Sequence, residues 1–204
     1  MKTLIIKGSF YLFGLIVISL GISLTINADL GAGAWDAMNV GLMETFGLTV
    51  GNWVIIIGGI LIITNALIAR ERPDLLAIIT IVIIGKMIDF WLITAFENME
   101  FSVMFNQVLA LVAGIFIIAI GVALYLQPKF SINPIDNFMV ALQKRFGFSL
   151  TFAKTLTEAF ALVLALFLGG PIGIGTIIIL VCIGPFIQFL NPKAEKVMNR
   201  LLAS

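Results

Sequence analysis

Long apolar runs constrain this chain more than any other feature of its sequence. Each run approaches the roughly 20 residues that a helix needs to cross a bilayer core about 30 Å thick. Six such runs are expected to be helices, at about 9–28, 50–69, 75–96, 105–127, 150–168 and 172–190. Of the 204 residues, 61% are hydrophobic and only 11% are charged, which is too few to cover a water-exposed surface. We therefore predict an all-α integral membrane protein with six transmembrane helices.

The composition also excludes several classes of site. The chain has no histidine and a single cysteine, Cys182, so Ser-His-Asp and Cys-His catalytic sets are excluded and a metal site is not expected. No basic patch with interleaved aromatic residues suggests nucleic acid as a partner. We expect no enzymatic activity and no cofactor, and the expected partners are the lipid bilayer and a small solute.

The sequence repeats itself at an offset of 100 residues. Residues 14–48 align without gaps with residues 114–148, and "IIGKMIDF" (83–90) aligns with "CIGPFIQF" (182–189) at an offset of 99. The identical pairs include Gly14 and Gly114, Gly21 and Gly121, Asp36 and Asp136. We predict two repeats, 1–98 and 105–192, with three transmembrane helices each, followed by a cytoplasmic tail at 193–204.

The distribution of charge predicts that the two repeats are inverted. Three helices per repeat is an odd number, so the second repeat should enter the membrane from the opposite side. Outside the expected helices, Lys and Arg occur only at the two ends of the chain and in loops 70–74 and 128–149, whereas loops 28–50 and 97–104 carry only acidic charges. By the positive-inside rule, both termini are expected to be cytoplasmic, in the inner cell membrane. Inverted repeats are common in secondary transporters.

Two polar loops interrupt the apolar sequence at equivalent positions, "LGAGAWDAMN" (30–39) and "FSINPIDNFM" (130–139). Each is expected to form an amphipathic or re-entrant helix of about three turns, closed by Phe-Gly. Asp36 and Asp136 then have two interpretations. They either offset the helix dipole near the N-cap, or they join Asn39 and Asn137 in a polar site between the repeats, where carboxylates favour a cation, a proton or an amine.

Four charged residues lie within the expected transmembrane helices. Lys86 lies near the bilayer midplane, with Asp89 three residues later on the same face. Lys154 is expected to extend to the interface, and Glu158 lies about two turns deeper. An ionisable group at mid-bilayer costs about 2.5–3.5 kcal/mol on insertion scales, so it usually faces a partner or a cavity. Salt bridges between helices and a solute site remain alternatives, and Lys86 is the best single candidate for function.

Two smaller features complete the expectations. The segment "LGGPIGIGT" (168–176) lacks the Lys-Ser/Thr of a phosphate-binding loop and should form a tight turn in which Gly173 and Gly175 allow close contact. Trp35 lies near an expected membrane boundary, which is typical of an interfacial anchor. The candidate solute-binding residues are Asp36, Asn39, Lys86, Asp89, Asp136, Asn137 and Glu158.

Four motifs resemble the YczE/YyaS/YitT group of bacterial integral membrane proteins, and the YczE branch above all. They are G-I-S-L (21–24), L-G-x-G-x-W-D (30–36), G-L-T-x-G (47–51) and G-x-G-T…G-x-x-I-x-F (173–189). The resemblance covers nearly the whole chain and implies a bacterial inner-membrane protein, without a substrate or a site residue.

The expected function is transport of a small solute by alternating access between the repeats, driven by a proton or cation gradient. A homodimer is also expected, because about 200 residues is small for a complete transporter. The alternatives are a substrate-binding membrane subunit of an ATPase-driven transporter, and an accessory or signalling membrane protein that transports nothing.

Overall fold

The computed structural model describes residues 1–99 and 101–203, and this part of the chain is built from helices without strands. The helices are α1 (Lys2–Asn27), α2 (Ala34–Phe46), α3 (Val50–Ala69), α4 (Ala77–Asp89) with its π-helical continuation η1 (Phe90–Ala95), α5 (Met104–Tyr125), α6 (Pro134–Phe146), α7 (Leu150–Phe167) and α8 (Ile174–Ala203). Six of these are long and apolar enough to cross a membrane, namely α1, α3, α4 with η1, α5, α7 and α8. The expected all-α fold with six candidate transmembrane helices is confirmed.

The last helix is longer than its apolar run. We expected α8 to end near residue 190, but it continues through Pro185 and Pro192 to Ala203. The expected tail from residue 193 is therefore a helical extension, apart from Ser204, which lies outside the described residues.

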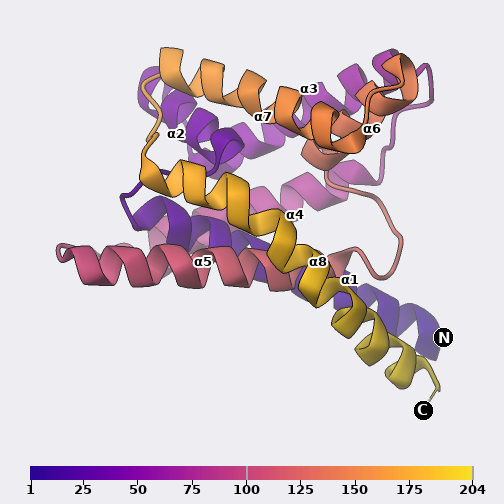
Figure 1. Ribbon diagram of the computed structural model, residues 1–204. Helices are drawn as coiled ribbons and strands as arrows, with labels where there is room; N and C mark the ends of the chain where they lie inside the picture. Colours follow the sequence, from indigo (N-terminus) through magenta and orange to yellow (C-terminus); the bar gives the residue numbers. More distant parts are fainter. Residues whose placement is uncertain (100, 204) are drawn as a thin grey trace.

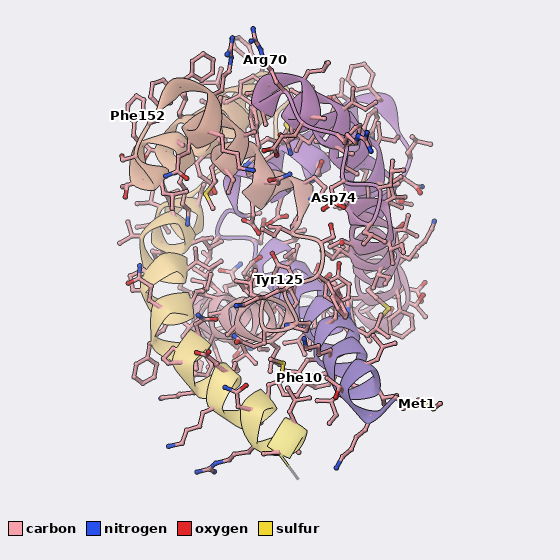
Figure 2. The ribbon with its side chains drawn as sticks, turned by 90° about the vertical axis from the view of Figure 1, so that its right-hand side faces the viewer. Met1, Phe10, Arg70, Asp74, Tyr125 and Phe152 are labelled. Carbon is pink, nitrogen blue, oxygen red and sulfur yellow. The ribbon has the colours of Figure 1, made fainter. Side chains whose placement is uncertain are left out.

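The long helices run side by side, and the two short helices α2 and α6 lie toward opposite ends of the bundle (Figure 1). Both termini are at the end nearer to α6. Figure 2 looks onto that end, where Met1 and Arg70 lie at the periphery and Tyr125 lies near the centre. The loop that contains Asp74 also faces the viewer there.

Helices α1 and α5 cross through two pairs of glycines that are equivalent under the 100-residue offset. A Cβ added at Gly14 would lie 2.9 Å from the Gly121 carbonyl oxygen, and one added at Gly121 would lie 2.8 Å from the Gly14 oxygen. Gly21 and Gly114 approach each other in the same way, at 2.8 and 2.9 Å. Only residues without a side chain permit two helix backbones to come this close. These two contacts between α1 and α5 are therefore equivalent under the 100-residue offset.

The two loop helices pack on the opposite repeat. Helix α2 packs on α7, and α6 packs on α3, whereas α4 packs on α1 and α8 packs on α5 within the same repeat. The local geometry also matches, since Asp29 and Lys129 both have a φ of 55°. Gly47 and Gly147 end α2 and α6 at φ values of 76° and 71°, which glycine adopts without strain.

The repeats differ in one helix pair. Helices α3 and α4 pack closely through Gly51 and Gly85, each of which lies against the backbone oxygen of the other. The equivalent helices α7 and α8 make little contact with each other. The two repeats therefore have different internal arrangements.

Candidate functional site

Ionisable side chains from α2, α6 and α7 gather where these helices meet. Glu158 interacts electrostatically with Asp36, Asp136 and Lys154, and Lys154 also interacts with Asp136. All four side chains are partly buried. We call these four residues the charge group. It unites one residue from the first repeat with three from the second.

The start of α6 explains how Asp136 reaches this group. Asn133 caps the helix by accepting a hydrogen bond from the Ile135 amide at 3.2 Å, and Pro134 is the first helical residue, as the sequence predicts. The Asp136 carboxylate accepts a hydrogen bond from the Tyr125 hydroxyl at 2.9 Å. Asp136 is thus in the first turn, where a carboxylate is favoured by the helix dipole, and it also contacts α5.

Asp36 occupies the equivalent position in the first turn of α2. A Cβ added at Gly33, the N-cap residue, would lie 2.9 Å from Asp36 Oδ2. The carboxylate therefore folds back over the cap, as the dipole interpretation expects, while it also interacts with Glu158. The two interpretations of these aspartates are compatible.

Burial changes the acidity of both aspartates. Burial, with a smaller contribution from the nearby Glu158 carboxylate, raises the pKa of Asp36 to about 7. Burial also raises the pKa of Asp136, although the hydrogen bond from Tyr125 and the charge of Lys154 oppose this effect. Asp36 can therefore take up and release a proton close to neutral pH.

An aromatic cluster adjoins the same three helices. Trp35 is 5% exposed, so the expectation of an interfacial anchor is wrong for this residue. Its ring packs against Phe138 and Phe160, with ring centroids 6.2 and 6.4 Å away. Trp35 Nε1 is buried and has no hydrogen-bond partner in the part of the chain that is described.

The expected ion pair between Lys86 and Asp89 does not form. Lys86 is exposed, and its Nζ lies 3.5 Å from Asn52 Oδ1. Asp89 instead accepts hydrogen bonds from the Thr49 hydroxyl at 2.7 Å and from the Gly51 amide at 2.8 Å. It thereby satisfies the N-terminus of α3, which is a structural role. Neither residue belongs to the charge group, and a role for them in solute binding stays a prediction.

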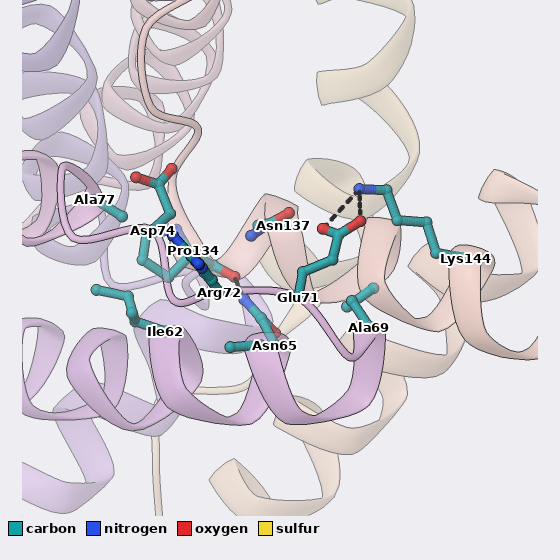
Figure 3. A pocket seen from close by; sticks show the side chains of 12 residues that line it. Ile62, Asn65, Ala69, Glu71, Arg72, Asp74, Ala77, Pro134, Asn137 and Lys144 are labelled. Carbon is teal, nitrogen blue, oxygen red and sulfur yellow. Dashed lines mark hydrogen bonds and ion pairs between the residues drawn. The ribbon is translucent and has the colours of Figure 1, made fainter.

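The two candidate asparagines lie apart from each other. Asn39 is 1% exposed, and its Oδ1 has no hydrogen-bond partner among residues 1–99 and 101–203. Asn137 lines a cavity of about 190 Å³ between α3, the loop 70–76 and α6 (Figure 3). Of the expected site, the structure links Asp36 and Asp136 through Glu158. Lys86, Asp89 and Asn137 make their contacts elsewhere, and Asn39 lies one turn after Asp36 in α2.

Sequence reasoning missed two members of this environment. Lys154 was expected at the interface, but its Nζ lies 4.0 Å from the position of a Cβ at Gly184 in α8. Tyr125 ends an uncharged helix, and no sequence pattern marks it. The i, i+4 spacing of Lys154 and Glu158 was the available signal, because it places both on one face. Within the described residues, no three acidic or cysteine side chains converge as metal ligands.

Comparisons with known proteins agree with the resemblance seen in the motifs. Residues 5–192 match the model of DUF6198, a family of unknown function. The chain is 40% identical over 190 residues to the uncharacterized protein YyaS of Bacillus subtilis (strain 168), which covers 93% of this chain and 94% of YyaS. It is 32% identical over 203 residues to the uncharacterized membrane protein YczE of the same strain, which covers 99% and 93%.

A third relative is an uncharacterized protein of Haemophilus influenzae, 26% identical over 183 residues, with 89% of this chain and 81% of the relative covered. No solved structure matches the chain. The expected kinship with YczE and YyaS is confirmed, and the identity is higher with YyaS than with YczE. Together with the six apolar helices, these relatives support a multi-pass membrane protein.

Proposed function

We propose that this chain, which belongs to the DUF6198 family of unknown function, is a permease for a small solute that works by alternating access between two inverted repeats. One observation carries the proposal. The equivalent aspartates Asp36 and Asp136 begin loop helices that lie toward opposite ends of the bundle, yet both interact with Glu158. A solute held by this charge group is within reach of elements from both ends.

The packing of the repeats supports the same proposal. The reciprocal glycine contacts of α1 and α5 are those that an approximate two-fold relation between the repeats would produce. Against that background, α3 and α4 are close together while α7 and α8 are not. If the repeats exchanged these arrangements, the side from which the charge group is reached would change, as in other inverted-repeat transporters.

The charge group favours a cationic substituent and a proton. Asp136 and Glu158 interact with Lys154, and Asp36 interacts with Glu158. Three carboxyl groups outnumber the one lysine, so a solute ammonium group would be attracted when they are ionised. The raised pKa of Asp36 means that a proton competes for the same site near neutral pH. We propose that solute and proton bind alternately, which would couple solute movement in one direction to proton movement in the other.

Reconstitution into liposomes that contain a pH-sensitive dye tests this proposal. Small amines and the common amino acids would be added to the outside, and solute-dependent proton flux would be recorded. Asp36→Asn and Asp136→Asn should abolish the flux, because the amide cannot release a proton. Asp29→Asn is the matched control, since Asp29 is exposed and its φ of 55° suits asparagine.

The outcomes separate the alternatives. Flux that survives both substitutions would refute the assignment of the charge group. Flux that depends on an added ATPase subunit would favour the membrane subunit of an ATPase-driven transporter. Absence of flux for every solute, with the protein folded, would favour an accessory or signalling role.

A further inference from the structure

The last turns of α8 extend beyond the apolar part of the helix. Helix α8 has 30 residues, so it is about 45 Å long at 1.5 Å per residue, whereas a bilayer core is about 30 Å thick. Its apolar run ends near residue 190, so residues 191–203 reach the headgroup region. We call residues 191–203 the α8 extension. It leaves the bundle at the end where both termini lie (Figure 1).

The two sides of the α8 extension differ in chemistry. Ala194 and Met198 are buried, so they mark the side that packs on the rest of the chain. Lys193, Lys196 and Arg200 are all exposed, and their i, i+3, i+7 spacing places them on one stripe of the helix. Since successive residues are about 100° apart, Lys196 lies about 160° from both Ala194 and Met198. These three residues, the basic stripe, therefore point away from the protein.

The basic stripe has no acidic partner within the described chain. Among residues 1–99 and 101–203, the ion pair of Lys144 with Glu71 is the only one. Glu195 is the one acidic residue of the α8 extension. The start of α1, at the same end of the bundle, adds Lys2 and Lys7. Negative charge that compensates the stripe is therefore to be sought outside the chain.

A cation–π contact sets the depth of the stripe. The Lys193 ammonium lies over the Phe189 ring, 3.4 Å from its centroid. Phe189 is 59% exposed and belongs to the last apolar turn of α8. The first lysine of the stripe is thus at the level where the apolar core of a bilayer ends and the headgroups begin.

The equivalent segment of the first repeat lacks this construction. At the offset of 99 residues, Lys193 corresponds to Thr94, and Lys196 corresponds to Glu97. The π-helical turn η1 ends at Ala95, so no long helix continues there. The two-repeat architecture therefore does not account for the α8 extension or its charges, and a separate role is called for.

We propose that the basic stripe binds the headgroups of anionic phospholipids in the leaflet at this end of the bundle. Phosphate oxygens accept charge-assisted hydrogen bonds from lysine and arginine, and each basic residue near an anionic surface favours binding about fivefold. The stripe faces sideways from the bundle at the level of the headgroups. Lipids, rather than soluble proteins, surround the chain at this level.

Lipid selectivity beside the stripe tests the proposal. The full-length chain with Cys182→Ser and Val197→Cys would carry a fluorophore at residue 197, which is 50% exposed and flanks the stripe, in phosphatidylcholine nanodiscs. Phosphatidylglycerol or phosphatidylcholine with a nitroxide on its acyl chain, added at the same mole fraction, would quench the fluorophore. At low salt, quenching should show a preference of at least about fivefold for phosphatidylglycerol, and higher salt should weaken it.

A matched pair of variants locates the site. Lys196→Gln combined with Arg200→Gln removes two charges from the stripe and should bring the preference close to one. Arg72→Gln combined with Arg145→Gln removes two exposed charges outside the stripe and should keep the preference. Because all four side chains are exposed, the thermal midpoint should change little in either variant.

Equal quenching by the two lipids would overturn the proposal. A preference that survives Lys196→Gln with Arg200→Gln would also overturn it, because the anionic lipid would then bind elsewhere. Loss of the preference in the Arg72→Gln, Arg145→Gln variant as well would reduce the effect to a general attraction between charges. The measurement needs neither solute nor proton flux, so its outcome is independent of the proposed permease activity.

Discussion

Substitution of the glycines between α1 and α5 gives the sharpest test of the packing. A Cβ at Gly121 would lie 2.6 Å from the Ile18 amide nitrogen, and one at Gly21 would lie 2.7 Å from the Ile118 nitrogen. Comfortable contacts of this kind begin at about 3.5 Å, so the helices would have to separate by about 0.8 Å. Overpacking of this size costs about 1–3 kcal/mol, and the separation also weakens neighbouring van der Waals contacts.

The controls come from the same chain. Gly59 in α3 has nothing within 4 Å of an added Cβ. Gly59→Ala should therefore stabilise the protein by up to about 1 kcal/mol, the gain in helix propensity. Gly21→Ala and Gly121→Ala gain the same propensity, so we expect each to fall about 1–3 kcal/mol below Gly59→Ala.

The free energy of unfolding in detergent micelles, measured by titration with a denaturing detergent, is the assay. The close crossing would be refuted if Gly121→Ala were as stable as Gly59→Ala. The equivalence of the repeats would be refuted if Gly21→Ala and Gly121→Ala differed by much more than about 1 kcal/mol.

Three further predictions follow from the geometry. Burial raises the folded-state pKa of Asp36 to about 7, so between about pH 4 and pH 7 the native state holds a proton that the unfolded state has lost. The free energy of unfolding should therefore fall as the pH rises through this window and level off above it. Asp36→Asn should flatten this fall in a series of thermal midpoints measured at different pH. Asp89→Ala removes two hydrogen bonds at the start of α3 and should cost about 1–3 kcal/mol of unfolding free energy, whereas Lys86→Ala should change it by about 0.5 kcal/mol or less; equal effects would contradict the assigned roles. With the native cysteine replaced by serine, Glu44→Cys and Lys144→Cys should react with an impermeant thiol reagent from opposite sides of the membrane, and labelling from one side would rule out inverted repeats.

Many helix boundaries could be predicted from the sequence, because they depend on residues close to each boundary. The limits of α3 at Val50 and Ala69 follow from a threonine cap before it, where the Asn52 amide donates to Thr49 Oγ1 at 3.1 Å, and from the loss of apolar residues after it. Asn133 and Pro134 fix the start of α6 in the same way. The 100-residue repeat also predicts that α2 and α6 begin and end at equivalent residues, as they do.

The rotation of each helix about its axis was harder to predict. Helix α4 is apolar apart from a few residues, so the sequence could not show that Asp89 bonds to the start of α3 while the exposed Lys86 reaches Asn52 in the same turn. The meeting of Asp36 with Glu158 depends on how α2 packs on α7, a contact between residues more than 100 positions apart. No periodic pattern in the sequence marks the cavity or the buried Asn65, because both depend on how α3, loop 70–76 and α6 pack together.

Helix α2 packs on the second repeat and α6 on the first, and this packing has a consequence for membrane insertion. Residues 1–98 leave the ribosome first, but one surface of α2 and one of α3 pack on α7 and α6 of the second half. The first half therefore waits in the bilayer as an incomplete intermediate until the second half has been inserted. The same mutual covering should let two separately synthesised halves recombine in one membrane.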